Sequence, residues 1–142
     1  MSQERLEHDV IIVGAGFAGI YALHKLRSMG LDVLAIEAGT EVGGTWYWNR
    51  YPGARCDVPS VEYSFSFDDA LQEEWRWSEV MAGQPEILQY AKHVADRFDL
   101  RRDILFDTEV LSARFDESAA KWVLKTKAGG EFVARFCLMA TG

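Results

Sequence analysis

The stretch DVIIVGAGFAG at residues 9–19 decides how this chain folds. An apolar run of strand character passes without a spacer into the pattern G-x-G-x-x-G, formed by Gly14, Gly16 and Gly19. In such a turn the first glycine permits a tight bend, the second lets the backbone approach a pyrophosphate, and the third brings the following helix close to the sheet. The free N–H groups at the start of that helix favour an anion. The stretch therefore predicts the phosphate-binding turn of a dinucleotide site.

The residues after the turn complete a strand–helix–strand unit. Apolar positions predict a helix over residues 17–29, and Gly30 stands where a C-terminal cap is expected. A second strand is expected over residues 31–36. It ends at Glu37, about 20 residues after the turn, where a carboxylate accepts hydrogen bonds from a ribose and repels a 2′-phosphate. The unit therefore predicts FAD or NAD at this site, and not NADP.

Length, composition and charge narrow the class of protein. The chain has 142 residues, of which 49% are hydrophobic and 26% charged, with a formal net charge of −7. A single domain is expected at this length, and we place a polar N-terminal arm at residues 1–8 and the domain at residues 9–142. The acidic balance, without a cluster of Lys or Arg, argues against nucleic acid as a partner.

Cysteine and histidine spacing argues against a metal site. Cys56 and Cys137 form no C-x-x-C pair, and the three histidines show no ligand spacing. We therefore expect reduced thiols and no metal. No apolar run approaches 18 residues and the first residues lack the apolar core of a signal peptide, so we expect a cytoplasmic protein without a membrane partner.

The second half of the chain predicts a covering helix and further strands. Gln84, followed by a proline, starts a helix whose apolar face repeats at helical spacing. A third short strand, parallel to the first two, is expected at residues 104–106. Strands at residues 109–115, 122–127 and 131–139, separated by turn residues, predict a meander. The predicted fold is α/β, a Rossmann-like βαβ domain with a parallel sheet, covering helices and a β-meander.

Between the second strand and the covering helix, residues 38–67 lose regular periodicity. Loops this long in compact domains are usually functional. Gly43 and Gly44 let a backbone approach a ligand, and Thr45 offers a hydroxyl beside them. The aromatic run that follows has two interpretations, a satellite core beneath a long loop or a wall against a flat ring system. Residues 68–77 predict a short helix or a surface segment.

The run GGTWYWNRYPGARCDVPS at residues 43–60, followed by EYSFSF at residues 62–67, resembles the N-terminal FAD-binding portion of type I Baeyer–Villiger monooxygenases. That group contains the cyclohexanone, phenylacetone and steroid monooxygenases. The resemblance covers nearly the whole chain, including QPEIL at residues 84–88 and ATG at residues 140–142. It implies an FAD-binding domain of an enzyme that uses NADPH and O2 to convert a small ketone to an ester or lactone.

The resemblance also implies which residues surround FAD. The pyrophosphate would meet the glycine turn, and the ribose would meet Glu37. Residues 45–48 would flank the FAD, Asp57 and Tyr63 would lie near the isoalloxazine, and the adenine would meet the backbone of Val110. The full set of implied FAD-binding residues is Gly14, Gly16, Ala18, Gly19, Glu37, Gly44, Thr45, Trp46, Tyr47, Trp48, Asp57, Tyr63 and Val110.

Arg55, Cys56 and Asp57 are implied to touch NADPH, whose site would lie mostly outside this chain. Asp57 is also the candidate catalytic residue, because its counterpart in the family partners an arginine that acts in the oxygenation. The other interpretation of Asp57 is a loop cap, since aspartate side chains commonly accept hydrogen bonds from neighbouring backbone amides.

Three features of the family are not found in this sequence: the F-x-G-x-x-x-H-x-x-x-W-P fingerprint, a second G-x-G-x-x-G and the active-site arginine. We therefore expect the isolated chain to form no ester or lactone. Two alternatives stay open. One is a non-catalytic FAD-binding fragment or module. The other is a different flavin-dependent monooxygenase, of the flavin-containing or N-hydroxylating type. The run at residues 46–57 argues against this second alternative.

Overall fold

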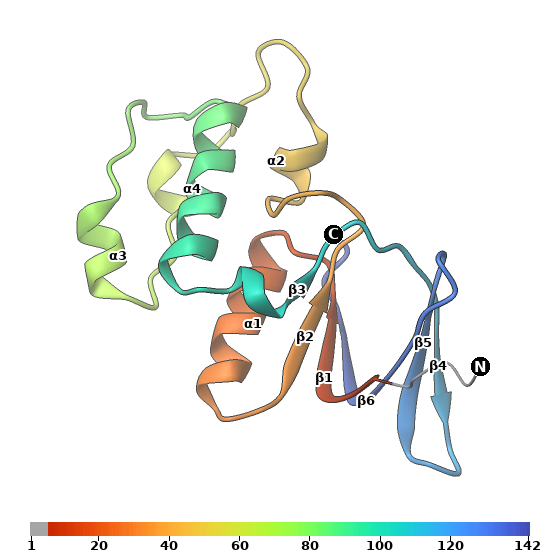
Figure 1. The fold of residues 1–142 in the computed structure, drawn as a ribbon. Coiled ribbons are helices and arrows are strands. Elements are labelled where there is room, and N and C mark those ends of the chain that lie inside the picture. Colours follow the sequence, from red (N-terminus) through yellow and green to blue (C-terminus); the bar gives the residue numbers. More distant parts are fainter. Residues whose placement is uncertain (1–5) are drawn as a thin grey trace.

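A computed structural model describes residues 6–142, which form one mixed sheet with helices packed on it (Figure 1). The elements in chain order are β1 (Leu6–Val13), α1 (Phe17–Ser28), β2 (Val33–Ile36), α2 (Thr45–Trp48), the 3₁₀ turn η1 (Ser60–Tyr63), α3 (Asp69–Glu74), α4 (Gln84–Arg97), the 3₁₀ turn η2 (Arg101–Asp103), β3 (Ile104–Leu105), β4 (Val110–Asp116), β5 (Lys121–Thr126) and β6 (Glu131–Met139).

The sheet joins a parallel half to an antiparallel half. Its strand order is β3-β2-β1-β6-β5-β4, in which β1 runs parallel to both β2 and β6. Val10 pairs with Val33 on one side and with Phe136 on the other. The pairs β4–β5 and β5–β6 are antiparallel and form the meander. The predicted Rossmann-like α/β fold, with its parallel third strand and its meander, is confirmed.

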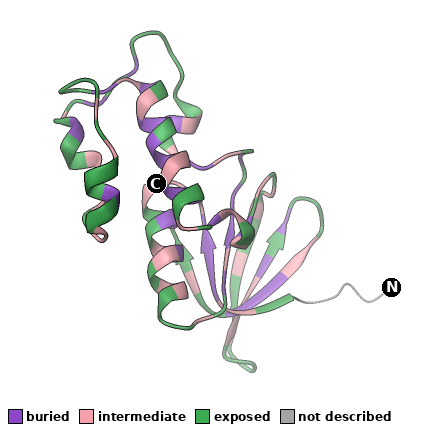
Figure 2. Ribbon diagram, turned by 60° about the vertical axis from the view of Figure 1, so that its left-hand side comes forward, coloured by how far each residue is buried: buried purple, intermediate pink, exposed green. Residues whose placement is uncertain are grey.

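Strand β1 is buried on both faces, which explains its unbroken apolar run. Val10 and Ile12 pack with residues of α1 and α4 in the larger core cluster. Ile11 and Val13, which point to the opposite face, pack with Leu124 and other residues of the meander. Figure 2 shows the buried residues concentrated in the strands and recurring along the helices. The sheet therefore separates two apolar layers, with helices on one side and the curled meander on the other.

Both long helices form as predicted. Helix α1 ends at Ser28, and Gly30 follows with φ +82°, the left-handed conformation of a helix-terminating glycine. Helix α4 carries its proline in the first turn and buries an apolar stripe that includes Ile87, Ala91 and Val94. Among the residues that the structure describes, no helix is long and apolar enough to cross a membrane.

Some element boundaries differ from the sequence-based expectation. Strand β1 starts at Leu6, which pairs with Phe132, so part of the proposed arm is strand, while residues 1–5 lie outside the described part of the chain. Residues 38–67 contain α2 and η1, each four residues long. A single turn is too short to show helical periodicity, and so neither element could be predicted from local sequence.

Candidate dinucleotide site

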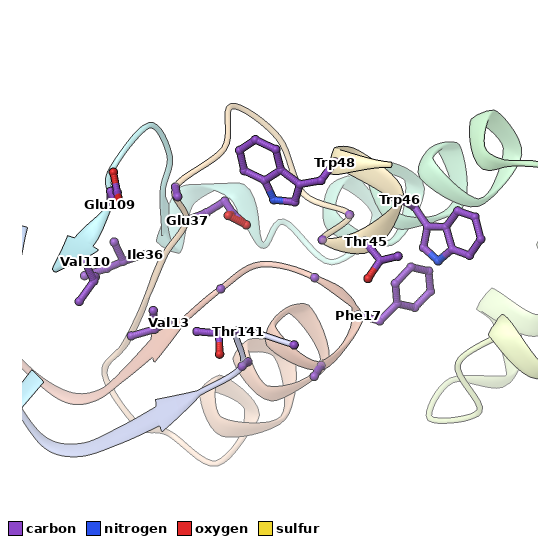
Figure 3. A pocket seen from close by; sticks show the side chains of 18 of the residues that line it. Val13, Phe17, Ile36, Glu37, Thr45, Trp46, Trp48, Glu109, Val110 and Thr141 are labelled. Atoms are coloured by element: carbon purple, nitrogen blue, oxygen red, sulfur yellow. The ribbon is translucent and has the colours of Figure 1, made fainter. Parts of the chain in front are cut away.

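A pocket of about 570 Å³ lies at the carboxyl ends of the parallel strands (Figure 3). Val13 ends β1, Ile36 ends β2, and Thr141 follows β6, and all three line it. The volume lies within the range of about 300–1,000 Å³ usual for small-molecule sites. In open α/β sheets ligands bind beyond these strand ends, where neighbouring connections diverge. The pocket therefore occupies the place in which this fold type holds a dinucleotide.

The glycine turn forms the floor of the pocket. Gly14 has φ +108°, and its N–H donates to the Ile36 carbonyl at 2.9 Å. A Cβ at Gly14 would lie 2.3 Å from the carbonyl oxygen of Ala140. A Cβ at Gly19 would lie 2.0 Å from the Gly14 carbonyl oxygen. Both positions therefore require glycine, because the turn, helix α1 and the segment after β6 approach one another at backbone distance.

A second pair of glycines, one in the turn and one in the loop before α2, brings these two segments into contact. A Cβ at Gly16 would lie 3.2 Å from the Gly44 Cα, and a Cβ at Gly44 would lie 2.9 Å from the Gly16 Cα. The Gly43 N–H donates to the Ala15 carbonyl at 3.0 Å. The loop before α2 thus docks backbone to backbone on the turn. Helix α1 starts here with no side-chain cap, so its first N–H groups are available to a ligand in the pocket.

Glu37 places a carboxylate in the pocket wall at the end of β2. The residue is 5% exposed. Its Oε1 lies 3.4 Å from the Ala15 N–H nitrogen and its Oε2 3.2 Å from that of Gly39. A carboxylate has about four acceptor sites, and these two long bonds leave capacity for a further donor. A ribose hydroxyl is a donor of the right kind for this position.

Aromatic rings form the opposite end of the pocket. Trp46 is 8% exposed and packs in a small core with Cys56 and Ile87. The Tyr63 ring meets the Trp46 ring edge to face at 5.6 Å and the Phe17 ring at 5.5 Å, both at 82°. All three residues line the pocket. Trp46 therefore anchors a satellite core, as the first interpretation of the aromatic run expects, and it also lines the pocket. The second interpretation, a wall against a flat ring system, stays a prediction.

Burial raises the pKa of the Tyr63 phenol above its ordinary value, and a hydrogen bond with Trp46 opposes that shift. The nearby Asp57 carboxylate adds a smaller contribution that raises the pKa further. Tyr63 is therefore a neutral phenol at physiological pH, and the aromatic end of the pocket carries no charge from it.

Gln84 holds helix α2 in place. Its buried amide Nε2 donates to the Trp46 carbonyl, and its own N–H donates to the Ala54 carbonyl at 2.8 Å. A helix of one turn is unstable alone and depends on tertiary contacts. Sequence reasoning assigned Gln84 only to a helix start. A glutamine at the first turn of a strongly apolar helix was the available signal, but nothing in its spacing indicated the partner.

The pocket gathers two thirds of the predicted cofactor-binding residues. The predicted residues that line it are Gly14, Gly16, Ala18, Glu37, Gly44, Thr45, Trp46, Trp48, Tyr63 and Val110. Figure 3 shows Val110 beside Ile36 and Val13 at one end, Glu37 between, and Trp46 with Phe17 at the other end. The pocket is therefore elongated, with the predicted adenine and isoalloxazine residues at opposite ends.

The other predicted residues, Gly19, Tyr47, Arg55, Cys56 and Asp57, do not line the pocket. The Tyr47 hydroxyl bonds with the Thr40 hydroxyl at 2.8 Å, and hydrogen bonds from Thr40 lower its pKa. Arg55 pairs with Glu79 at 2.8 Å, and Cys56 is buried behind Trp46. Asp57 is exposed. Contacts of these residues with a cofactor stay predictions.

Sequence reasoning missed several lining residues, among them Phe17, Thr108, Glu109 and Thr141. Phe17 occupies a variable position of the glycine pattern, where any side chain satisfies the motif. Thr108 and Glu109 belong to the link between β3 and β4, which has no motif. The Thr108 N–H donates to the Glu37 carbonyl at 3.0 Å, and this hydrogen bond holds the link beside the pocket.

The residues present fit a flavin dinucleotide. The glycine cradle has no room for side chains, the carboxylate of Glu37 faces the middle of the pocket, and aromatic rings wall one end. Among the described residues there is no group of three or more His, Cys, Asp or Glu side chains that could hold a metal ion.

Comparison with known proteins agrees with this geometry. The family described as "NAD(P)-binding Rossmann-like domain" matches residues 12–75. An acetone monooxygenase (methyl acetate-forming) of Gordonia sp. is 47% identical over 94% of this chain and 25% of its own length. A phenazine N-monooxygenase of Lysobacter antibioticus is 46% identical over 100% of this chain and 26% of its own. A Baeyer–Villiger monooxygenase of Pseudooceanicola batsensis is 44% identical over 96% of this chain and 25% of its own length.

Solved structures give the same result. An oxidised steroid monooxygenase bound to NADP superposes with a TM-score of 0.94 at 60% identity, over 96% of this chain and 26% of that one. The chain thus spans about a quarter of the length of the relatives that it matches. Along nearly all of its own length the chain shares the sequence and fold of Baeyer–Villiger monooxygenases.

Proposed function

We propose that the chain is the FAD-binding portion of an NADPH- and O2-dependent flavoprotein monooxygenase that converts a small-molecule ketone to an ester or lactone. The names of its relatives support this reaction class, and so does the pocket. We further propose that the parent enzyme is cytoplasmic. The reaction is assigned to the parent enzyme, because the chain covers only about a quarter of its relatives.

One observation carries the proposal: a single pocket joins a backbone cradle and a buried carboxylate to an aromatic wall. The cradle suits a pyrophosphate, the carboxylate of Glu37 suits an unphosphorylated ribose, and the wall formed by Trp46 and Tyr63 suits a flat ring system. NAD lacks the tricyclic ring that such a wall would meet, and NADP would set its 2′-phosphate against Glu37. FAD is the cofactor whose parts match all three.

When bound, FAD would accept a hydride and react with O2. The chain's own residues bind and orient it. The N–H groups at the start of α1 hold the pyrophosphate, and the Glu37 carboxylate accepts from the ribose hydroxyls. The rings of Phe17, Trp46 and Tyr63 exclude water from one end of the pocket. Asp57, exposed beside Tyr63, is proposed as the charge partner of an arginine supplied by the rest of the parent enzyme.

Equilibrium titration tests the cofactor. Flavin fluorescence and isothermal calorimetry on the purified chain are expected to show binding of FAD and much weaker binding of NADP. Glu37→Gln keeps the shape of the side chain and removes its charge. It is expected to weaken the binding of FAD by about tenfold, or about 1.4 kcal/mol. It should also reduce the ratio of the affinity for FAD to the affinity for NADP. Tighter binding of NADP than of FAD by the unaltered chain would refute the assignment.

A second candidate reaction is favoured by one relative, the phenazine N-monooxygenase at 46% identity. A parent enzyme that oxidises a ring nitrogen would use the same FAD-binding portion. Assay of a polypeptide containing this segment within a full-length relative's framework distinguishes the two. Esters or lactones from ketones, carrying 18O from 18O2, support the first reaction, and N-oxides from phenazines support the second. Binding of FAD without either product supports a non-catalytic module.

A further inference from the structure

Aromatic rings form an unbroken array that leads away from the pocket wall. The Trp46 ring contacts Tyr63 at 5.6 Å between centroids, Tyr63 contacts Phe17 at 5.5 Å, and Phe17 contacts Tyr90 at 6.1 Å. Aromatic pairs in contact have centroids about 4.5–7 Å apart. Each step of the array therefore joins rings that touch. Its first three members line the pocket.

The array reaches the surface beside α3 and α4. Tyr90 contacts Trp77 at 5.1 Å and Trp75 at 5.2 Å, and these two indoles contact each other at 5.6 Å. Tyr90 is fully buried, whereas Trp75 and Trp77 are half-buried. Glu74, which precedes Trp75, accepts hydrogen bonds from His93 and Arg97 and adds an acidic group there. One end of the array therefore faces the pocket and the other meets water.

Tryptophan and tyrosine are the side chains that lose a single electron most readily, and a positive charge is costly in an apolar interior. A ring that has lost an electron is therefore stabilised where it meets water and can give up a proton, as at the half-buried Trp77, whose Nε1 donates to the Ser64 hydroxyl oxygen. Burial raises the pKa of Tyr90, so its phenol is neutral and serves as a step between the two ends. Phe17 is hard to oxidise, so an electron moving between Tyr63 and Tyr90 would have to tunnel across it.

We propose that the array from Trp46 and Tyr63 to Trp75 and Trp77 conducts single electrons from the protein surface to the pocket wall. A one-electron oxidant of the photoexcited-flavin or metal-complex class, bound in the pocket, takes one electron from Trp46 and leaves an indole radical cation. An electron from Trp77 or Trp75 then refills Trp46 by way of Tyr90, whose phenol oxygen accepts from the Phe65 N–H and keeps its own proton. The electron deficit ends on a surface indole. Where it ends on Trp77, the Nε1 proton leaves through the Ser64 hydroxyl, which lies 2.8 Å away, accepts it and gives its own proton to water.

Such a path would preserve the pocket of an oxygenase. Any one-electron oxidation of the wall would be repaired from the surface, and the damage would be confined to a ring outside the site. The inference goes beyond the proposed function and rests on it only for the flavin used as the oxidant below.

Illumination of the FAD-loaded chain tests the path. Photoexcited flavin is a one-electron oxidant. Oxygen is removed, ferricyanide reoxidises the flavin, and a nitroso spin trap adds to ring radicals, which are then located by peptide mass spectrometry. We expect adducts on Trp75 and Trp77. Trp122, a half-buried indole that contacts Phe115 and lies outside the array, is expected to stay unlabelled. Adducts confined to Trp46 and Tyr63, or equal labelling of Trp122, would overturn the proposal.

Two variants locate the route. Tyr90→Phe keeps the ring and removes the readily oxidised phenol, and it is expected to cause a several-fold loss of label on Trp75 and Trp77. Tyr51→Phe is the matched control, since Tyr51 is 65% exposed and lies outside the array, and its label should match that of the unaltered chain. If Tyr90→Phe fails to fold, as judged by circular dichroism, the double variant W75F/W77F takes its place and should shift the label to Tyr63. Unchanged labelling in a folded Tyr90→Phe chain contradicts the route.

Separate binding data keep the two proposals distinguishable. Failure of the chain to bind FAD refutes the proposed function and not the array. In that case a ruthenium photo-oxidant is attached to a cysteine introduced at Asn49, which lines the pocket, in a Cys137→Ser background. The same labelling of Trp75 and Trp77, and the same loss with Tyr90→Phe, is expected. Its absence refutes the array by itself.

Discussion

The two ends of the pocket are made of different parts of the chain. The cradle is made of backbone, where Gly14, Gly16 and Gly44 bring three segments within van der Waals contact. The aromatic end is made of side chains, which are held by a one-turn helix and by packing against α4. The cradle therefore tolerates no added atom, whereas the aromatic end depends on supporting contacts that lie behind the pocket.

The comparison predicts the largest loss for Gly16→Val. The new side chain would occupy the space of the pyrophosphate, and its Cβ alone would lie 3.2 Å from the Gly44 Cα. We expect FAD affinity to fall by about a thousandfold or more, about 4 kcal/mol. Fluorescence titration measures it. Lys92→Ala, on α4 and away from the pocket lining, is the control. Undiminished binding by a folded Gly16→Val chain would place the phosphate site elsewhere.

Trp46 and Trp48 form a matched pair on α2, one buried and one 60% exposed. Trp46→Ala leaves a cavity in the satellite core and is expected to lower the free energy of unfolding by about 3 kcal/mol. Trp48→Ala is expected to change it by less than about 0.5 kcal/mol. Urea denaturation monitored by circular dichroism gives both values. Equal losses of unfolding free energy in the two variants would mean that the packing of Trp46 in the satellite core does not stabilise the aromatic end.

Gln84→Leu tests that support directly. The substitution removes the donor to the Trp46 carbonyl and leaves this buried acceptor unsatisfied, at a cost of about 1–3 kcal/mol. FAD affinity should fall as well, because α2 loses its anchor. Gln72→Leu, an exposed position on α3, serves as the control and should leave both quantities unchanged. An unaltered urea midpoint for Gln84→Leu would show that packing alone fixes α2.

A smaller effect is expected from pH. His24 stacks on Phe67 at 4.5 Å, and burial lowers its pKa, with Arg27 and Lys25 adding to the shift and Asp68 opposing it. The unfolded chain therefore binds this proton at a higher pH than the folded one. Stability should fall as the pH drops through about 6.5, the ordinary value for histidine.

Thermal melts between neutral and mildly acidic pH measure this dependence. His24→Gln should flatten it, whereas Gln72→Leu, at an exposed position on α3, should not. A pH dependence that survives in His24→Gln would assign the effect to another group.

The two ends of the pocket also differ in how far they could be predicted. The glycine spacing encodes backbone geometry directly, and so the turn, helix α1 and Glu37 followed from local sequence. The aromatic end has no spacing pattern of this kind in the sequence. Its composition was compatible with a core or a ligand wall, and only the structure shows that Trp46 packs against Ile87 and Tyr63 and also lines the pocket.

The fold was easier to predict than the site. The strands of the meander and the long helices carry clear periodicity, and their bounds differ from the expectation by only a few residues at most. The site depends on contacts between segments far apart in the chain. The link at Thr108, the anchoring amide of Gln84 and the approach of Gly44 to Gly16 have no local pattern. Sequence spacing could not supply them.

The place of β6 in the sheet affects how the protein is made. Val10 finds one of its partners, Val33, soon after it leaves the ribosome, but its other partner, Phe136, lies 126 residues further along the chain. During elongation one edge of β1 therefore stays open, and pairing so distant in sequence is slow. An open apolar strand edge is a site of association with other chains. Slower translation would prolong that interval, and the yield of soluble protein should depend on temperature and on chaperone supply.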